Sequence, residues 1–428
     1  MVQLHLHTKY SLLDAMINIE SLGKKLFELG QDTVAITDHG NLYACVEAYS
    51  TLSKMGIKVI NGCEVYICDD VNVTNKDSKY YHLILLCKNE TGRQNLNKLV
   101  SESTLHRYYG KPRIDFELLK QHHDGLICLS ACMAGEVQRA LALEDFDGAR
   151  TIALKYKELF GDDYYLEYQS HRNNEQQSLN KAVVDLASEL GIEYVVTTDA
   201  HYLNESDQKY HSMFVQIGTQ REAGETYEDC FVQSEDEIRK ICWKTRKYND
   251  IAIANTHKIA DKCENTIPLS APIMPHVDVP AQYKSEKQWL QDLCNKGFEA
   301  KGFKNWTLDE WKNYMSDLPE GSDVIPVDCK TAKDYRDLYI ERARYEMNAI
   351  SEMGFIGYYL LVHSYGNSVK RRGLARGSGA GSLLAYLCNI VDVDPIKYKL
   401  YFERFIDVGA LDLLREKTIT KKELKIPD

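Results

Sequence analysis

The sequence predicts an α/β protein in two parts, a barrel-like α/β domain followed by a mostly helical region. Within the first ~250 residues, seven short apolar segments rich in β-branched and aromatic residues alternate with segments of helical spacing. This order is typical of parallel sheets, and seven or eight such units are enough to close a barrel. Beyond them, four of the nine prolines fall between Pro268 and Pro280, which indicates an extended connection and a domain boundary.

The predicted strands span residues 2–7, 33–38, 58–66, 80–87, 125–130, 163–169 and 192–198. Between them, apolar residues recur every three or four positions, which predicts helices. These helices span 19–29, 42–55, 92–100, 135–159 and 175–190, and residues 236–264 are also predicted to be helical. After the prolines, 342–353 and 382–390 are further helix candidates. We therefore expect a first domain over residues 1–267, an extended linker over 268–283 and a second domain over 284–428.

Composition restricts the class of protein. The 428 residues suggest two or three domains at ~150 residues each. The formal charge of −11 argues against a uniformly basic coat protein, although a local basic groove on an acidic body is compatible with nucleic acid. No apolar run approaches the ~20 residues of a membrane span, and the first residues do not form a signal peptide. The twelve cysteines then fit reduced thiols in a cytoplasmic protein.

Metal-capable side chains lie in or just after the predicted strands. They are His5, His7, Asp14, His39, Glu64, His82, Cys132, Asp199 and His201. Because strand ends of an α/β barrel meet at one rim, we expect these residues to converge. Histidine and cysteine suit zinc, and carboxylates can bridge two ions. Nine ligands are too many for one ion and predict two or three, an arrangement that suits phosphoester hydrolysis because it clamps the phosphate and lowers the pKa of a bound water.

Taken one at a time, these residues have a more ordinary interpretation than metal binding. A single histidine at a strand end is more often a packing or surface residue, and a lone His-X-His pair is frequently accidental. His171, which follows the sixth strand, fits either an ordinary role or a lining role in contact with phosphate. The joint pattern over most of the strand ends is what favours a metal site.

A glycine-rich turn opens the last predicted helix at Arg376-Gly377-Ser378-Gly379-Ala380-Gly381-Ser382. Free backbone N–H groups at a helix start suit an anion, and Arg376 adds a charged donor for a phosphate oxygen. The motif alone fits equally well a tight turn that lets a helix pack closely. The preceding basic run, Lys370, Arg371 and Arg372, fits either a phosphate partner or a solvated helix face.

Several of these segments resemble a known family. "LHLHTKYSLLD", "AITDHGNLYACVEAY", "GCEVYI", "LSACMAGEV" and "TTDAHYL" are similar to the N-terminal PHP (polymerase and histidinol phosphatase) domain of bacterial family C replicative polymerases, the DNA polymerase III alpha subunits. The stretch from "RYEMNAISEMGFIGYYLL" to "YKLYFERFID" is similar to the start of the palm domain of the same polymerases.

The resemblance implies a distorted (β/α)7 barrel that holds up to three divalent ions, zinc or manganese, and a metal-dependent 3′→5′ exonuclease. It assigns the first ion to His5, His7, Glu64 and Asp199. The second ion is assigned to Glu64, His82 and Cys132, with Glu64 as the bridge. The third ion is assigned to Asp14, His39 and His201.

In the second region the resemblance implies that Arg376, Gly377, Ser378, Gly381 and Ser382 hold the triphosphate of an incoming deoxynucleotide. One departure is Gly373-Leu374-Ala375, where the family usually has Gly-Pro-Gly. The magnesium-binding aspartates of synthesis lie beyond Pro427-Asp428, so we expect this chain not to polymerise alone. The implied partners are a DNA primer–template with its 3′ end, the remaining polymerase segment and a sliding clamp, with no membrane.

Two alternatives stay open. One is a free-standing PHP phosphoesterase of the histidinol-phosphatase type, which has no need for the Arg376–Ser382 turn. The other is a non-catalytic replication scaffold whose metals only stabilise the fold. For the exonuclease, we expect DNA to reach the site along the basic strip 106–113, where Tyr108 and Tyr109 are placed to stack on bases.

Overall fold

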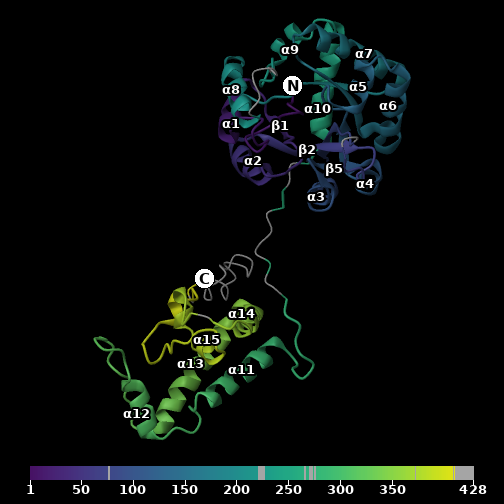
Figure 1. The fold of residues 1–428 in the computed structure, drawn as a ribbon. Coiled ribbons are helices and arrows are strands. Elements are labelled where there is room, and N and C mark those ends of the chain that lie inside the picture. Colours follow the sequence, from purple (N-terminus) through teal and green to yellow (C-terminus); the bar gives the residue numbers. More distant parts are fainter. Residues whose placement is uncertain are drawn as a thin grey trace. The chain divides into compact units, whose positions relative to one another are not determined.

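The computed structural model describes residues 1–428 except 76–77, 220–226, 265–266, 269–272, 274–275, 372, 408 and 410–428. Pro272, Pro275, Arg372 and the Pro427-Asp428 end therefore lie outside the described residues. The chain divides into two compact units, Met1–Pro268 and Leu269–Asp428, which are shown in Figure 1. No helix among the described residues has both the length and the apolar character needed to cross a membrane.

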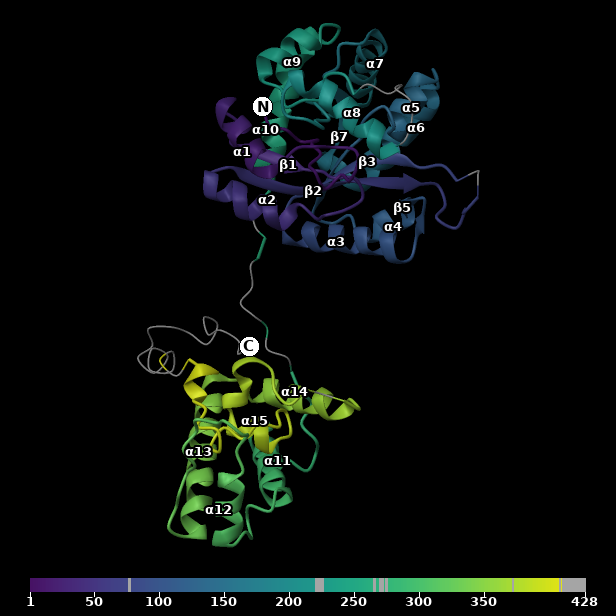
Figure 2. The ribbon, with the colours of Figure 1, turned by 60° about the vertical axis from the view of Figure 1, so that its left-hand side comes forward.

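The first unit is built on a curled mixed sheet. Its strands are β1 (Thr33–Ile36), β2 (Lys58–Cys68), β3 (Tyr81–Cys87), β4 (Tyr108–Tyr109), β5 (Lys111–Asp115), β6 (Leu126–Leu129), β7 (Tyr164–Gln169) and β8 (Tyr194–Thr197). The main order is β1–β2–β3–β6–β7–β8, and β5 with β4 extends the sheet beside the end of β2. Figure 2 shows β2 as the long strand of this sheet.

The N-terminal segment closes the sheet into a ring. Ala35 N donates to Gln3 O at 2.7 Å on the β1 side, and His7 N donates to Ala200 O at 2.8 Å just after β8. One buried cluster contains a side chain from this segment and from each of β1, β2, β3, β6, β7 and β8, together with Ile259 and Ala260 of the last helix of the unit. The predicted barrel-like α/β fold is therefore confirmed, but the predicted strand over 2–7 is not a regular strand, because it joins its neighbours only through isolated bridges at Gln3 and Leu6.

The direction of one strand corrects the prediction of a parallel sheet. β3 runs antiparallel to both β2 and β6, whereas the pairs β1–β2, β6–β7 and β7–β8 are parallel. No described residue between β2 and β3 is helical, so the chain turns back directly beside the strand it has left. A parallel neighbour requires a crossover of a dozen or more residues, usually a helix.

The helices of the first unit cover the ring (Figure 1). They are α1 (Ile19–Glu28), α2 (Cys45–Leu52), α3 (Glu90–Leu105), α4 (Phe116–Gln121), α5 (Glu136–Ala142), α6 (Phe146–Phe160), α7 (Asn174–Leu190), α8 (Gln208–Thr219), α9 (Glu235–Ile241) and α10 (Asn249–Lys262). Short 3-10 turns are η1 (Ser53–Met55), η2 (Gly161–Asp163), η3 (Glu205–Asp207) and η4 (Arg246–Tyr248). Side-chain caps fix several starts; for example, Asn89 accepts from Gly92 N and Asn173 from Gln176 N.

The predicted helix over 135–159 is wrong as a single element, because the structure has α5 and α6 in its place. Glu144 between them has a φ of 59°, in the left-handed region that ends a helix. Asp145 then caps α6 by accepting from Gly148 N at 2.9 Å. The local cap outweighs the apolar periodicity that continues across the break.

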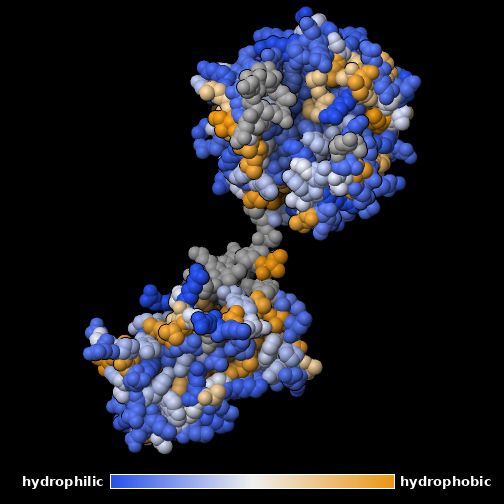
Figure 3. All heavy atoms as spheres, in the orientation of Figure 1, coloured by the Kyte–Doolittle hydropathy of each residue, from blue (hydrophilic) through white to orange (hydrophobic). Residues whose placement is uncertain are grey.

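The second unit is helical, as predicted. Its elements are α11 (Glu286–Ala300), α12 (Leu308–Ser316), α13 (Ala332–Met353), α14 (Ile356–Ser368), η5 (Gly377–Gly381), α15 (Leu383–Leu387) and η6 (Phe402–Arg404). Its own buried core is rich in aromatic residues, including Phe303, Trp311, Tyr335, Tyr339 and Phe402. The surfaces of both units are mainly hydrophilic on the face drawn in Figure 3, with smaller hydrophobic patches between.

Candidate metal centre

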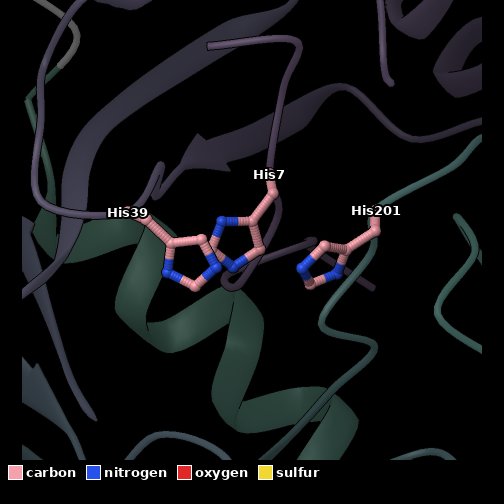
Figure 4. A group of neighbouring side chains, drawn as sticks. All are labelled: His7, His39 and His201. Atoms are coloured by element: carbon pink, nitrogen blue, oxygen red, sulfur yellow. The ribbon is translucent and has the colours of Figure 1, made fainter. Parts of the chain in front are cut away.

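The nine predicted ligands form one connected cluster, built from the N-terminal segment, from β2 and β3 and from the loops that follow the strands. His5 and His7 project to the same side of the extended N-terminal segment because alternate residues of a strand share a face. Glu64 on β2 and His82 on β3 are diagonal neighbours, since the register pairs Tyr66 with His82. Figure 4 shows His7, His39 and His201, which come from three different segments, with their rings turned toward one another.

Glu64 lies at the centre of the cluster, with both carboxylate oxygens engaged. Its Oε1 is 2.7 Å from His82 Nδ1 and 3.7 Å from Cys132 Sγ. Its Oε2 is 2.9 Å from His39 Nδ1 and 3.2 Å from His7 Nε2. This geometry suits a carboxylate that bridges two ions.

Asp199 is the second carboxylate that contacts several of the predicted ligands. Its Oδ1 lies 3.1 Å from His5 Nε2, 3.2 Å from His7 Nε2 and 3.7 Å from His201 Nδ1. Asp199 has a φ of 47°, a left-handed backbone that is uncommon for a residue with a side chain and that recurs at functional sites. The turn brings both Asp199 and His201 to the cluster directly after β8.

Asp14 completes the cluster from the loop that follows the N-terminal segment. Its Oδ2 is 2.7 Å from His39 Nε2 and 3.5 Å from His201 Nε2. Its Oδ1 accepts a hydrogen bond from Tyr227 OH at 2.9 Å. Burial raises the pKa of Asp14, but the contacts with His201 and His39 outweigh it and hold the pKa well below the usual range.

Four buried atoms of this cluster have no hydrogen-bond partner among the described residues. They are His39 Nδ1, Glu64 Oε2, Asp199 Oδ1 and His201 Nε2. Each lies within 4 Å of another ligand atom, so these groups converge without donating to one another. Buried polar atoms are normally satisfied, and converging carboxylate and imidazole atoms are the donor set of a zinc or manganese ion. The residues therefore fit a divalent-metal centre.

The structure groups the ligands somewhat differently from the assignment that the resemblance implied. Three sets have donor atoms within 4.8 Å of one another: His5, His7 and Asp199; His39, Glu64 and His82; and His7, His39 and His201. The expected second set of Glu64, His82 and Cys132 is also close, since Cys132 Sγ lies 3.5 Å from His82 Nδ1. The division of the nine ligands among individual ions stays a prediction.

Opposite charges inside the cluster oppose the cost of burial. Burial raises the pKa of Glu64, but His82, His39 and His5 outweigh it and hold that pKa well below its usual value. Burial lowers the pKa of His39, yet Glu64 and Asp14 raise it to about 10. The pKa values of His5 and His201 are raised as well, so metal binding at these three histidines must displace protons.

Sequence reasoning missed Glu167, which supports the cluster from β7. Its Oε1 lies 2.7 Å from His5 Nδ1 and accepts from Thr197 OH at 2.5 Å, and its side chain is fully buried. A carboxylate on the far nitrogen of a metal-binding histidine fixes the tautomer and orientation of the ring. The signal in the sequence is an acidic residue in the middle of an otherwise apolar strand.

Ser11 and Asp38 orient His7 in the same way. His7 Nδ1 lies 3.0 Å from Ser11 Oγ, and Ser11 OH donates to Asp38 Oδ1 at 2.7 Å. Thr8 holds the same buried carboxylate through its backbone N–H and its hydroxyl. This arrangement explains why Asp38, next to a predicted ligand in the sequence, is itself not part of the ligand cluster.

A cavity of about 820 Å³ opens onto the cluster. Seven of the nine predicted ligands line it; His5 and His7 lie behind them, fully buried. Its other walls include Tyr10, Tyr66, Tyr80, Tyr227 and residues of the β4–β5 hairpin. His171 is not in the lining; its Nε2 lies 3.4 Å from Thr198 O and 3.6 Å from Cys230 Sγ.

The glycine-rich turn of the second unit differs from its expected form. The N–H groups of Leu383 and Leu384 donate to the buried carboxylate of Glu346 at 3.0 and 3.1 Å, so an internal anion already occupies this helix start. Ser382 is fully buried and bonded to Glu346 and Tyr359. The expectation of free N–H groups at the start of α15 is therefore wrong, and Ser382 acts here as a helix cap.

The remaining predicted residues of that turn divide into two groups. Arg376 and Gly377 are exposed and line a second cavity of about 810 Å³, which Tyr358, Tyr365 and other side chains complete. Neither Ser378 nor Gly381 belongs to that lining. Nucleotide binding at Arg376 and Gly377 stays a prediction.

Comparison with known proteins identifies both halves of the chain. Residues 3–171 match the PHP domain model, and residues 288–411 match the bacterial DNA polymerase III alpha NTPase domain model. DNA polymerase III subunit alpha of Treponema pallidum is 34% identical over 424 residues, and that of Helicobacter pylori strain 26695 is 35% identical over 433 residues. Each match covers 96% of this chain and 34% of the relative. The chain thus spans about a third of the length of these relatives.

Solved structures give lower similarity. A crystal structure from Bifidobacterium adolescentis assigned as a metal-dependent phosphoesterase is 14% identical, with a TM-score of 0.35 over 57% of this chain and 96% of that chain. An amidohydrolase from Chromobacterium violaceum is 15% identical, with a TM-score of 0.29 over 47% of this chain and 87% of that chain.

Proposed function

The chain belongs to the DNA polymerase III alpha subunit family, and we propose that its first unit hydrolyses DNA from the 3′ end with two or three divalent metal ions. The observation that carries the proposal is the gathering of nine ligand-competent side chains into one cluster around the carboxylates of Glu64, Asp199 and Asp14, with four buried atoms that lack a hydrogen-bond partner among the described residues. A structural zinc site is closed by four ligands and has no need of a cavity above it.

The nine side chains named above would hold the ions, with zinc or manganese as the metal. When bound, such ions polarise the phosphate, activate a water and stabilise the charge on the departing oxygen. Glu167 and Ser11 hold the rings of His5 and His7 in one orientation, which fixes the cluster before substrate arrives.

The second unit extends the proposal to synthesis. We infer that it is the beginning of a polymerase palm in which Arg376 and Gly377 contact the phosphates of a deoxynucleoside triphosphate. The magnesium site of the complete polymerase, its primer–template, the rest of the polymerase and a sliding clamp are part of the same proposal. In this proposal the chain has two domains, residues 1–267 and 284–428, joined by a linker over 268–283.

A cleavage assay tests the hydrolytic proposal. The purified chain, with manganese or zinc, is incubated with a 5′-labelled primer whose 3′ end is mismatched. We expect stepwise shortening from the 3′ end, and its loss in His5→Ala and in Asp199→Ala while circular dichroism shows that the barrel remains folded. His257→Ala, at a half-exposed position on α10, is the matched control and should cleave like the parent. Retained cleavage in both ligand variants would show that the cluster is not the active site.

A small phosphate ester in the same assay separates the proposal from the free-standing phosphoesterase alternative. An enzyme for small esters would hydrolyse a sugar or amino-alcohol phosphate quickly and leave the primer intact. The proposed exonuclease shows the opposite preference. A chain that retains its metal but hydrolyses neither substrate would support the scaffold alternative.

A further inference from the structure

The β4–β5 hairpin forms one wall of the cavity over the metal centre. Tyr108, Gly110, Lys111 and Pro112 all belong to the lining. The hairpin is short, with Tyr108 paired to Pro112 and Tyr109 paired to Lys111. Gly110 at its tip has a φ of 69°, which favours glycine. None of these residues is a candidate metal ligand, so this wall is available for substrate.

Lys111 supplies a positive charge to this wall. It is the one lysine or arginine among the described residues that line the cavity. Its Nζ lies 3.3 Å from Tyr66 OH and 4.9 Å from the centre of the Tyr66 ring. Within the part of the chain that the structure describes, no carboxylate pairs with it. Its charge thus remains available for an anion in a cavity whose floor holds three carboxylates.

Tyr108 and Tyr109 are placed differently although they are adjacent. The Tyr108 side chain is 61% exposed and lines the cavity. Tyr109 is outside the lining, and its ring lies against the guanidinium of Arg113 at 5.2 Å. Tyr108 and Lys111 therefore offer an exposed aromatic ring and a cation to the same cavity. Binding sites for single-stranded nucleic acid combine these two elements, with the ring stacking on a base and the cation contacting a phosphate.

The hairpin is held firmly against the metal-ligand loops. A Cβ on Gly40, which follows the ligand His39, would lie 2.6 Å from Pro112 Cγ, so only glycine lets the hairpin approach this closely. On the other side, buried Arg113 donates to Val71 O and Val73 O, both at 2.9 Å. A wall fixed in this way presents Tyr108 and Lys111 at a constant position relative to the ligands.

We propose that Tyr108 and Lys111 form a nucleotide subsite that adds to the metal centre, with Lys111 contacting a backbone phosphate next to the scissile one and Tyr108 stacking on the adjoining base. This inference rests on the proposed hydrolysis of DNA and gives it a substrate class, an unpaired oligonucleotide end rather than a small phosphate ester.

Binding is the first test because it does not depend on turnover. Fluorescence anisotropy measures the affinity of the full chain, loaded with manganese, for a short labelled oligodeoxythymidylate whose phosphorothioate linkages resist hydrolysis. Lys111→Ala should reduce the slope of log K against log salt by about 0.7, the share of one phosphate contact on a single strand. Tyr108→Ala should weaken binding about fivefold or more, and Tyr108→Phe should bind like the parent. Lys98→Ala, an exposed lysine on α3, is the charge-matched control.

Hydrolysis is the second test, with two substrates. On an unmodified oligodeoxythymidylate, kcat/KM should fall at least tenfold in Lys111→Ala and in Tyr108→Ala. On methyl 4-nitrophenyl phosphate, which has one phosphate and no base, both variants should match the parent. Lys111→Arg should recover most of the loss because it restores the charge.

The outcomes separate this inference from the hydrolytic proposal. Binding by the parent without cleavage, weakened in both variants, would overturn the hydrolytic activity and leave the subsite in place. Cleavage by the parent with unchanged binding and kcat/KM in both variants would overturn the subsite alone. Equal losses on both substrates would show that the hairpin acts on the metal ligands, and that result would also overturn the subsite. A parent chain that does not bind the oligonucleotide would overturn the subsite as well.

Discussion

Glu64 and Glu167 are two buried glutamates with different positions in the candidate metal centre. Both carboxylates are buried in the ring, where an unpaired charge is costly. Glu64 offsets that cost through contacts with histidines at each of its oxygens, and Glu167 through His5 and Thr197. The two residues therefore have different predicted roles: Glu64 would contact the bound ions, and Glu167 would orient His5, one of the candidate ligands.

We expect Glu167→Gln to weaken metal binding by ~10–100-fold without unfolding the barrel, because the amide keeps the shape of the side chain but not its charge on His5. Metal content after dialysis against a graded chelator, measured by mass spectrometry, checks this. Glu193→Gln, at a half-exposed position that pairs with Lys258, is the control and should retain metal like the parent. Equal metal content in both variants would contradict the assigned role of Glu167.

At the scale of elements, an ion-pair network of three residues connects η2 with the end of β3 and with helix α10. Asp163 lies 2.7 Å from Lys88 Nζ and 2.9 Å from Lys262 Nζ. Burial raises the pKa of Asp163, but hydrogen bonds from Lys88 and Lys262 lower it further than burial raises it. A depressed pKa means that the folded state favours the carboxylate, so the stabilisation is present above the unfolded pKa of ~3.9 and is lost as pH falls through the folded value.

Asp163→Asn should therefore destabilise the first unit by ~1 kcal/mol at neutral pH and by progressively less below pH ~4. Urea unfolding curves of parent and variant across this pH range give the comparison. Asp162→Asn, at a fully exposed neighbouring position, should leave the curves unchanged. A difference between parent and Asp163→Asn that is constant from neutral to acid pH would contradict the ionic origin.

In the second unit, α11 packs against α15 through a glycine. A Cβ on Gly297 would lie 1.8 Å from Leu387 O, which is backbone and cannot rotate away. Gly297→Ala should cost ~1–3 kcal/mol, whereas Gly366→Ala on α14, where nothing lies within 4 Å, should be neutral or stabilise by up to ~1 kcal/mol. Thermal melts of the two variants test this, and similar losses in both would show that the close helix approach is not what Gly297 provides.

On the scale of the whole molecule, two units with separate cores predict two unfolding transitions. The predicted metal-binding side chains all lie in the first unit. An ion that binds only the folded state stabilises that state, by ~2.7 kcal/mol at a concentration 100 times Kd. Removing the metal should lower the melting temperature of the first transition by several degrees and leave the second in place. Calorimetry with and without chelator distinguishes the two transitions. The Gly297→Ala variant identifies the second one, because it should lower only the transition of the second unit. A shift of both transitions would contradict independent units.

From the sequence alone, six of the seven strand segments and most of the helices could be predicted, and nine candidate ligands could be named; residues 2–7 join the sheet only through isolated bridges. Strand and helix preferences act over a few residues, so the apolar segments of the first unit could be recognised without their partners. The candidate ligands could be named because metal-capable residues recur in or just after most of the strand segments, as in His5-Leu6-His7 and Asp199-Ala200-His201.

Only the tertiary structure decided which residues support or restrict those sites. The reversed direction of β3, the pairing of Glu167 with His5 and the position of Lys111 beside the cavity depend on contacts between distant parts of the chain. The same holds for Glu346, whose carboxylate accepts from the N–H groups of Leu383 and Leu384 at the helix start that follows the Arg376–Ser382 turn. The sequence around the turn does not indicate that the Glu346 carboxylate will bind there, because a buried helix start binds whichever anion the fold brings nearest.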